Sequence, residues 1–346
     1  MSALTTFFKA LAKLLVKPGQ LWWGVGEIVR ALCRVLRRLR RRTPCRGDAG
    51  CLRLPEAYKR PDPLIYSQHY LYSMGLAVTW DNPDIQLFEP GHGGPQSVGA
   101  PVASHALQPA HVYRVRVQVW NGSYDAPAVG LPVHLSYLSF GVATNTHVVG
   151  TTFIELGVKG SPHAPAFAFF DWMTPEAAGH YCLQARLEWS DDANPNNNLG
   201  QENVDVGATS SPAVFRFTLR NPATSRMRFA FETDTYRLPA SAPCDQSPYT
   251  QGRERPRTRL AESQARWEVA RREHGAGGFP VPPDWTISID PADPFLAAGE
   301  EIDVTVSVDL STPTGDRHAT LNVNAFALEH EESHFVSGVT FQIEKA

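Results

Sequence analysis

Alternation of apolar and polar residues dominates the chain from about residue 76 onward. The stretch 113–120 is the clearest case, because Tyr113, Val115, Val117 and Val119 alternate with basic or polar residues. A period of two predicts a half-buried β-strand. The same pattern predicts further strands at 131–138, 147–155, 165–171, 181–189 and 201–206. Strands at this spacing, with no helices between them, are typical of a β-sandwich, which we place at 76–208.

A second series of alternating segments predicts a second sandwich over 209–346. Residues 241–283 interrupt it, and the strong helix formers at 257–273 predict one surface helix there. The strands of this second sandwich are predicted at 213–219, 226–231, 285–289, 302–308, 319–327 and 336–343.

The N-terminal residues have a helical period instead of a β period. Apolar positions three and four apart predict helices at 3–17 and 21–42, and Pro18-Gly19 separates them. Prolines and weak periodicity then predict a connector over 43–75. The apolar stripe of the two helices consists of Phe7, Leu11, Leu14, Trp22, Val29 and Leu36.

The charge of the chain changes this picture. A net charge of −3 conceals two opposite parts, because residues 1–60 hold 14 Lys and Arg against 3 Asp and Glu, whereas the remainder holds 18 against 32. An amphipathic basic helix is typical of attachment to an anionic membrane surface or to a groove in a protein assembly. Packing on the protein's own sandwich is the third alternative. The attachment residues are the apolar stripe together with Trp23, Arg37, Arg38, Arg40, Arg41 and Arg42.

The sequence predicts neither a membrane span nor a secretion signal. No run of about 20 uncharged apolar residues exists, and Lys9, Lys13 and Lys17 interrupt the N-terminal apolar run, which no cleavage site follows. We therefore expect a cytoplasmic protein, held peripherally at the inner membrane face if lipid is the partner. Five cysteines leave at least one thiol unpaired within the chain, and Cys45 and Cys51 could close a small loop.

Four short motifs within 82–206 carry a family resemblance. They are Asn82-Pro83-Asp84-Ile85, Val115–Asn121 followed by Ala126 to Leu135, Trp172-Met173-Thr174-Pro175 followed by Gly179-His180-Tyr181, and the turn from Asp191 to Asn198. Together they resemble the bacterial adhesion-related immunoglobulin-like domain family called CARDB, although the stretch 136–150 looks longer here. The resemblance implies an immunoglobulin-like sandwich and little about function. The predicted fold is therefore mainly β, with two immunoglobulin-like β-sandwich domains after an N-terminal amphipathic helical segment.

Two candidate metal sites have simpler interpretations. His330-Glu331-Glu332-Ser333-His334 matches the zinc motif H-E-x-x-H, but predicted strands on both sides place it on a hairpin loop instead of a helix. The oxygen-rich loop with Asp191, Asp192, Asn194 and Asn196 could bind Ca²⁺, yet it lacks a bidentate Glu and fits a turn rich in Asx hydrogen bonds. We predict no metal, no cofactor and no catalytic residue.

These observations favour a non-catalytic structural or adaptor protein, which binds a protein partner or multi-subunit assembly and which the N-terminal helices recruit. One alternative is an exported adhesion or carbohydrate-binding module, which the resemblance permits. Another is a metallohydrolase that uses His330 and His334. Nucleic-acid binding is not expected, because no aromatic residues alternate with the arginines and the body is acidic. The sequence does not predict an oligomeric state.

Overall fold

The structure is a computed structural model that describes part of the chain. The described residues are 60–139, 141–142, 145–206, 214–238, 259–310, 318–329 and 332–344. The predicted N-terminal helices, the possible bridge between Cys45 and Cys51, and His330 lie outside them.

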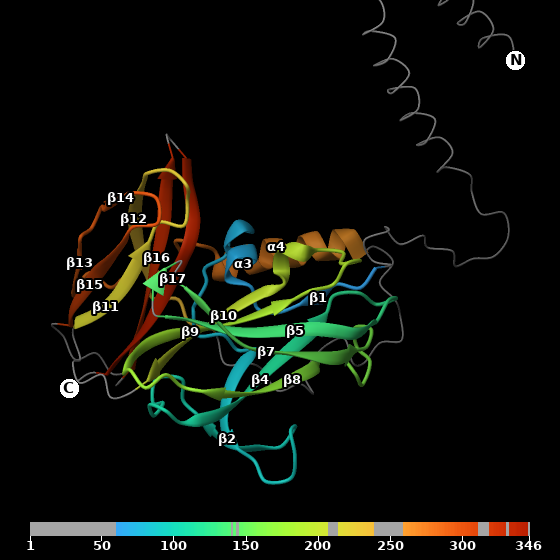
Figure 1. Ribbon diagram of the computed structural model, residues 1–346. Helices are drawn as coiled ribbons and strands as arrows, with labels where there is room; N and C mark the ends of the chain where they lie inside the picture. Colours follow the sequence, from blue (N-terminus) through green and yellow to red (C-terminus); the bar gives the residue numbers. More distant parts are fainter. Residues whose placement is uncertain are drawn as a thin grey trace, which may run out of the picture. The chain divides into compact units, whose positions relative to one another are not determined.

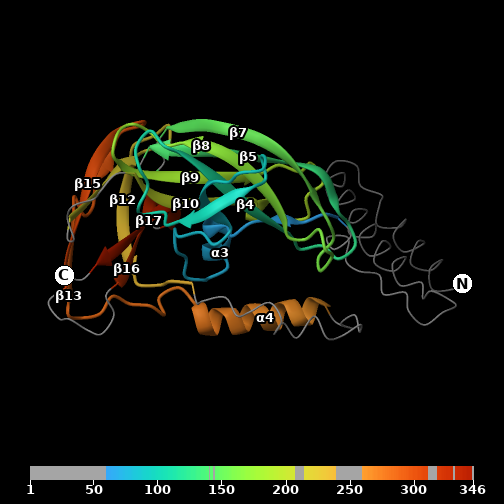
Figure 2. The same ribbon diagram turned by 90° about the horizontal axis from the view of Figure 1, so that it is seen from below.

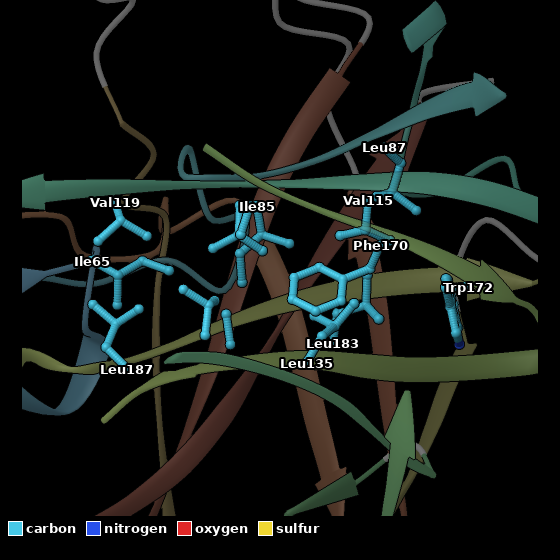
Figure 3. Close-up of a cluster of buried hydrophobic side chains, with 14 of the residues drawn as sticks. Ile65, Ile85, Leu87, Val115, Val119, Leu135, Phe170, Trp172, Leu183 and Leu187 are labelled. Carbon is cyan, nitrogen blue, oxygen red and sulfur yellow. The ribbon is translucent and has the colours of Figure 1, made fainter. Parts of the chain in front are cut away.

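Two antiparallel sheets enclose the first hydrophobic core (Figure 1). One sheet has the strand order β1-β4-β2-β3, and β8 pairs with β4 along the edge opposite to β2. The second sheet has the order β10-β9-β5-β7. Alternating apolar side chains of both sheets, such as Val115, Leu135, Phe170 and Leu183, point into this core (Figure 3). The strands are β1 (Pro63–Leu64), β2 (Ile85–Pro90), β3 (Val98–Val102), β4 (Val112–Asn121), β5 (Ala128–Ser139), β7 (Thr146–Leu156), β8 (Ala166–Met173), β9 (Gly179–Leu187) and β10 (Leu199–Val206).

A second pair of four-stranded sheets encloses a separate core. Their orders are β13-β15-β11-β6 and β14-β12-β16-β17, and Leu219, Phe229, Leu321 and Phe341 are among the buried residues. The strands are β11 (Val214–Arg220), β12 (Met227–Asp234), β13 (Trp285–Asp290), β14 (Phe295–Leu296), β15 (Glu301–Leu310), β16 (His318–Glu329) and β17 (Glu332–Glu344). The mainly β prediction is confirmed, and each predicted strand matches an observed one.

One short strand of the second pair of sheets comes from the first series of strands. Strand β6 (Gly141–Val142) lies between β5 and β7 in the chain but pairs in parallel with Thr218 and Leu219 of β11. The stretch 136–150, which looked longer than in the CARDB family, thus contributes a strand to the second core's sheet.

Three helices accompany the sheets in the described residues. They are α3 (Gln68–Ser73), the 3-10 helix η2 (Pro195–Asn197) and α4 (Arg259–His274). The predicted surface helix is confirmed by α4, which lies outside the sheets (Figure 2). The connector predicted over 43–75 is not wholly irregular, because it contains β1 and α3. None of the helices in the described ranges is long and apolar enough to cross a membrane.

Asn121-Gly122 has the local signature of a two-residue hairpin turn, but the structure has no hairpin there. Strands β4 and β5 belong to different sheets, so the chain crosses from one sheet to the other at this point. Asn121 is buried and organises the crossing: its Nδ2 donates to the carbonyls of Ala126 and Gly157, both at 2.9 Å, and its Oδ1 accepts from the Ser123 N–H at 2.8 Å. Asn121 is therefore a structural residue whose partners come from more than one loop.

Candidate interaction site at the junction of the two cores

Trp80 connects the two cores and is fully buried, with 0% of its surface exposed. Its carbonyl accepts from the Asn203 N–H on β10 at 2.9 Å, which ties it to the first pair of sheets. Its own N–H donates to Thr340 Oγ1 on β17 at 2.7 Å, and its indole Nε1 donates to Asn324 Oδ1 on β16 at 3.2 Å. Both cores belong to one compact unit, Leu54–Ala346, and Trp80 bonds directly to strands of each.

A chain of polar side chains extends from Trp80 across the second pair of sheets. Thr340 Oγ1 donates to Asn322 Oδ1 at 2.6 Å, and Asn322 Nδ2 donates to Asp234 Oδ1 at 2.7 Å. Asn324 Nδ2 donates to the other carboxylate oxygen of Asp234 at 3.0 Å. Burial raises the pKa of Asp234, and the hydrogen bonds from Asn322, Asn324 and the Tyr236 N–H partly offset that effect. Buried polar networks of this kind fix one arrangement when every member is bonded.

Helix α3 joins the same junction from the side of the first core. Gln68 is fully buried; its Nε2 donates to the Gln201 carbonyl on β10 at 2.6 Å and to the Thr79 carbonyl at 3.2 Å. One helical turn further along α3, Tyr72 stacks on Phe335 of β17, with 4.3 Å between ring centroids, and lies 5.7 Å from Phe326 of β16. Each such aromatic pair contributes about 0.5–1.5 kcal/mol beyond the burial of its area.

Strand β17 leaves no room for a side chain at position 338, next to the indole of Trp80. A Cβ on Gly338 would come within 2.3 Å of Trp80 Nε1 and within 2.7 Å of the Val323 carbonyl. A glycine at this position of β17 therefore permits the close approach of Trp80.

Glu202 on β10 is a buried carboxyl next to the same segment. It accepts a hydrogen bond from the Asn82 N–H. Burial, reinforced by the negative charge of Asp81, raises the pKa of Glu202 well above its ordinary value, and hydrogen bonds from Asn82 and Ser104 partly offset this. The folded protein therefore favours the protonated form.

We expect the Glu202→Gln variant to gain stability over the native chain as pH rises. Because the pKa is raised on folding, the stabilisation from Glu202 is complete below its unfolded pKa of about 4 and is lost as pH rises toward the folded pKa. Glutamine resembles the protonated carboxyl and has no such dependence. Denaturant unfolding at several pH values from about 4 upward measures the difference in unfolding free energy; a difference that does not change with pH contradicts the protonated state.

A separate polar surface lies on the outer side of the β2-β4-β8 sheet. The Arg116 guanidinium lies over the rings of Phe88 and Phe167, at 4.7 and 5.3 Å from their centroids. Arg114 is largely buried beside it, and its Nε donates to Asp171 Oδ1 at 2.6 Å. The two aromatic rings and the Asp171 carboxylate thus hold both arginine side chains against the outer face of the sheet.

The structure places the loop with the predicted oxygen ligands around η2. Asp192 Oδ1 accepts from the Asn194 N–H at 2.8 Å, Asp192 Oδ2 accepts from Asn198 Nδ2 at 2.6 Å, and Asn194 Oδ1 accepts from the Asn196 N–H at 3.4 Å. Asp191 forms an ion pair with Arg60 at 3.7 Å. The loop thus has the side-chain to backbone hydrogen bonds of an Asx-rich turn.

His334 lies on strand β17, opposite Ala327 of β16, and its side chain is exposed. A strand does not give the helical spacing of four residues that an H-E-x-x-H zinc site needs. No group of three or more His, Cys, Asp or Glu in the described part of the chain is arranged to hold a metal ion. The attachment residues, from Phe7 to Arg42, lie outside the described residues.

The sequence did not reveal the junction. A signal was present in β16, where Asn322 and Asn324 alternate with the core residues Leu321, Val323 and Ala325. Asparagine is an unusual choice for the solvent side of a strand, and both of these residues are buried. The partners of the two asparagines could not be inferred, because they lie far away in the sequence.

Comparison with known proteins identifies similar folds only. No protein-family model matches the chain, and no curated protein matches it. Among solved structures it is similar to a CARDB domain from Pyrococcus furiosus, crystallised with two metal ions, at 16% identity and a TM-score of 0.27, covering 46% of this chain and all of that domain. The predicted resemblance to CARDB is confirmed.

Two other solved structures are similar over a larger share of the chain. Escherichia coli alpha-2-macroglobulin matches at 10% identity and a TM-score of 0.21, covering 70% of this chain and 16% of that protein. The Yersinia pseudotuberculosis adhesin InvE matches at 12% identity and a TM-score of 0.18, covering 68% of this chain and 55% of that one. At these values the function has to be argued from the chain's own residues.

Proposed function

We propose that this protein is a non-catalytic adaptor with two immunoglobulin-like β-sandwich domains, 76–208 and 209–346. Its basic N-terminal segment attaches the chain to an anionic membrane surface on the cytoplasmic side, and the two sandwiches act as one rigid body that presents surfaces to protein partners. The observation that carries this proposal is the junction, where the single residue Trp80 bonds to β10, β16 and β17.

Details of the two sandwiches support the immunoglobulin-like assignment. Tyr181 lies near the start of β9, where the chain passes from one sheet to the other, and its hydroxyl donates to the Ala177 carbonyl at 2.8 Å. This bond has the form of the tyrosine corner of immunoglobulin-like domains. Asn121 is the last residue of β4, and Asn221 directly follows β11. The side chain of each asparagine accepts a hydrogen bond from the N–H two residues ahead and donates to carbonyls of other loops.

The chemistry of the junction supports a structural role. Asp234, Asn322, Asn324 and Thr340 bond to one another or to the neighbouring backbone. A catalytic or ligand site needs groups oriented toward a substrate, whereas these groups are oriented toward each other. The network holds one domain against the other, which suits a protein that presents surfaces at a fixed spacing.

The composition of residues 1–42 supports attachment to lipid. Each apolar side chain of the stripe, such as Phe7 or Trp22, contributes about 1.5–3 kcal/mol when fully covered. Each arginine of the run from Arg37 to Arg42 contributes about 1 kcal/mol near an anionic surface, and this attraction is screened by salt. A lipid surface therefore predicts binding that weakens gradually as salt rises.

We expect the full-length protein to float with vesicles containing phosphatidylserine at low salt, and less at high salt or with phosphatidylcholine alone. The double variant Phe7→Glu with Trp22→Glu should not float. The double variant Val269→Glu with Phe295→Glu, which places the same charges at exposed apolar positions of the body, is the matched control and should float as the native chain does.

Two results of this flotation experiment would contradict membrane attachment. One is a native chain that stays out of the vesicle fraction at low salt but forms a complex of fixed stoichiometry with a protein partner, which would indicate docking on an assembly. The other is equal flotation of the native chain and the Phe7→Glu, Trp22→Glu variant.

A further inference from the structure

The sheet β10-β9-β5-β7 has one covered edge and one open edge. At the β10 edge, the Leu107 N–H donates to the Asp205 carbonyl at 3.0 Å and the Asp205 N–H donates to the Ser104 carbonyl at 2.7 Å. At the other edge, β5 is the only strand that pairs with β7 within the described part of the chain. Strand β7 runs for 11 residues, so its outer side offers a long row of backbone donors and acceptors for another strand.

Two exposed side chains of β7 are large and apolar, which is unusual for an open edge. Val148 is 81% exposed and Phe153 is 69% exposed. Natural edge strands are protected by lysine, proline or inward-pointing charges, yet β7 contains no Lys, Arg or Pro and its one carboxylate is Glu155, near its end. Its composition permits pairing with another strand.

A bulge places both apolar side chains on the same face of the sheet. Residues five apart on a regular strand point to opposite faces. In β7 the register shifts by one at Val149, so that Phe153 lies opposite Pro132 and Val148 lies opposite Ser136 of β5. Pro132 and Ser136 are separated by four residues and share one face, and Phe153 and Val148 therefore share the outer face.

This placement makes β7 complementary to itself. If two copies of β7 pair antiparallel about a two-fold axis with 148 opposite 153, each Phe153 meets Val148 of the second copy on the outer face. Thr151 then lies opposite Thr151 of the second copy at the two-fold axis, because the bulge places Val149 and Gly150 together opposite the single residue Thr152. Glu155 lies opposite Thr146, and the two Glu155 carboxylates are about 26 Å apart at ~3.3 Å per residue, so they do not repel each other.

We propose that the protein forms a two-fold symmetric homodimer through antiparallel pairing of β7 with β7 of a second copy. The contact is isologous, as in most homodimers, and it joins the two β10-β9-β5-β7 sheets into one continuous sheet. Backbone hydrogen bonds give the pairing its direction, and the two Phe153–Val148 cross-strand pairs fix its register.

Disulfide trapping in the full chain tests both the dimer and its register. In a background with Cys33, Cys45, Cys51 and Cys244 replaced by Ser, we expect Val148→Cys mixed with Phe153→Cys to give a disulfide-linked dimer under mild oxidation. Directly opposite residues have Cβ atoms about 4.5–5.5 Å apart, close to the separation that a disulfide needs. Either variant alone should give no linked dimer, and a link formed by one variant alone would overturn this register.

Sedimentation equilibrium of the native chain tests the dimer without cysteines. Val148→Lys should weaken the dimer at least about tenfold, because a charge replaces an apolar partner on both sides of the two-fold axis. Val269→Lys, at an exposed position on α4, is the control and should leave the dimer unchanged. A monomeric native chain, or a Val148→Lys variant that dimerises as strongly as the native chain while folded by circular dichroism, would overturn the proposal.

Discussion

Replacement of Trp80 with alanine is expected to lower the free energy of unfolding by about 3–5 kcal/mol, the range for a large buried aromatic side chain. The loss has two causes, one in the contacts of the side chain itself and one in the contact between the two cores. The indole fills the space between α3, β16 and β17, with its ring 5.9 Å from Phe335, and its Nε1 satisfies Asn324. Without it, Asn324 loses a buried partner and the two cores lose a shared contact.

The Trp80→Ala variant should also separate the unfolding of the two cores. Calorimetry of the native chain is expected to show a single transition, and the variant is expected to show two, because each core keeps its own buried cluster. Trp80→Phe is the matched control: it retains much of the ring packing and removes only the indole hydrogen bond, so we expect a loss of about 1–2 kcal/mol and one transition. A single unchanged transition in Trp80→Ala would show that other contacts hold the cores together.

Replacement of Asn221 with alanine is the second large effect. Asn221 is fully buried, and its Nδ2 donates to the carbonyls of Ser225, Leu296 and Ala297 at 2.7, 3.1 and 3.0 Å, while its Oδ1 accepts from the Ala223 N–H at 3.0 Å. Each buried group left unsatisfied costs about 1–3 kcal/mol. We therefore expect a loss of about 4 kcal/mol or more in the free energy of unfolding, measured by denaturant titration.

A control for Asn221→Ala is available in the loop around η2. Asn196 is exposed, and Asn196→Ala should change the free energy of unfolding by no more than about 0.5 kcal/mol, as surface substitutions generally do. If Asn221→Ala lowered the free energy of unfolding no more than Asn196→Ala does, the hydrogen bonds of Asn221 would not be what stabilises the crossing between β11 and β12.

The sequence by itself determined the long strands and α4. Their signal is local, because a strand with one buried face must alternate apolar and polar residues and a surface helix needs only helix formers. The bounds of β4 (Val112–Asn121) and β5 (Ala128–Ser139) differ from the predicted ones by only a few residues. The resemblance to CARDB predicted, in addition, that the first pair of sheets is immunoglobulin-like.

The short strands were decided by tertiary contacts. Strand β6 has two residues and pairs with β11, which lies about 75 residues further along the chain. No local sequence pattern therefore predicts β6. Strands β2 (Ile85–Pro90) and β3 (Val98–Val102) contain Pro90, Gly99 and Pro101, which weaken the alternation. Helix α3 has six residues in a segment that prolines led us to treat as a connector.

The role of individual polar residues also depended on the tertiary structure. Asn121 followed by glycine has the local signature of a hairpin turn, but its Nδ2 reaches Gly157, 36 residues away. Trp80 and its partner Asn324 are 244 residues apart, and Trp80 and Thr340 are 260 apart. A sequence shows that these residues can donate and accept hydrogen bonds; only the folded chain brings donor and acceptor within 3.2 Å, because the packing of the two cores decides which distant segments meet.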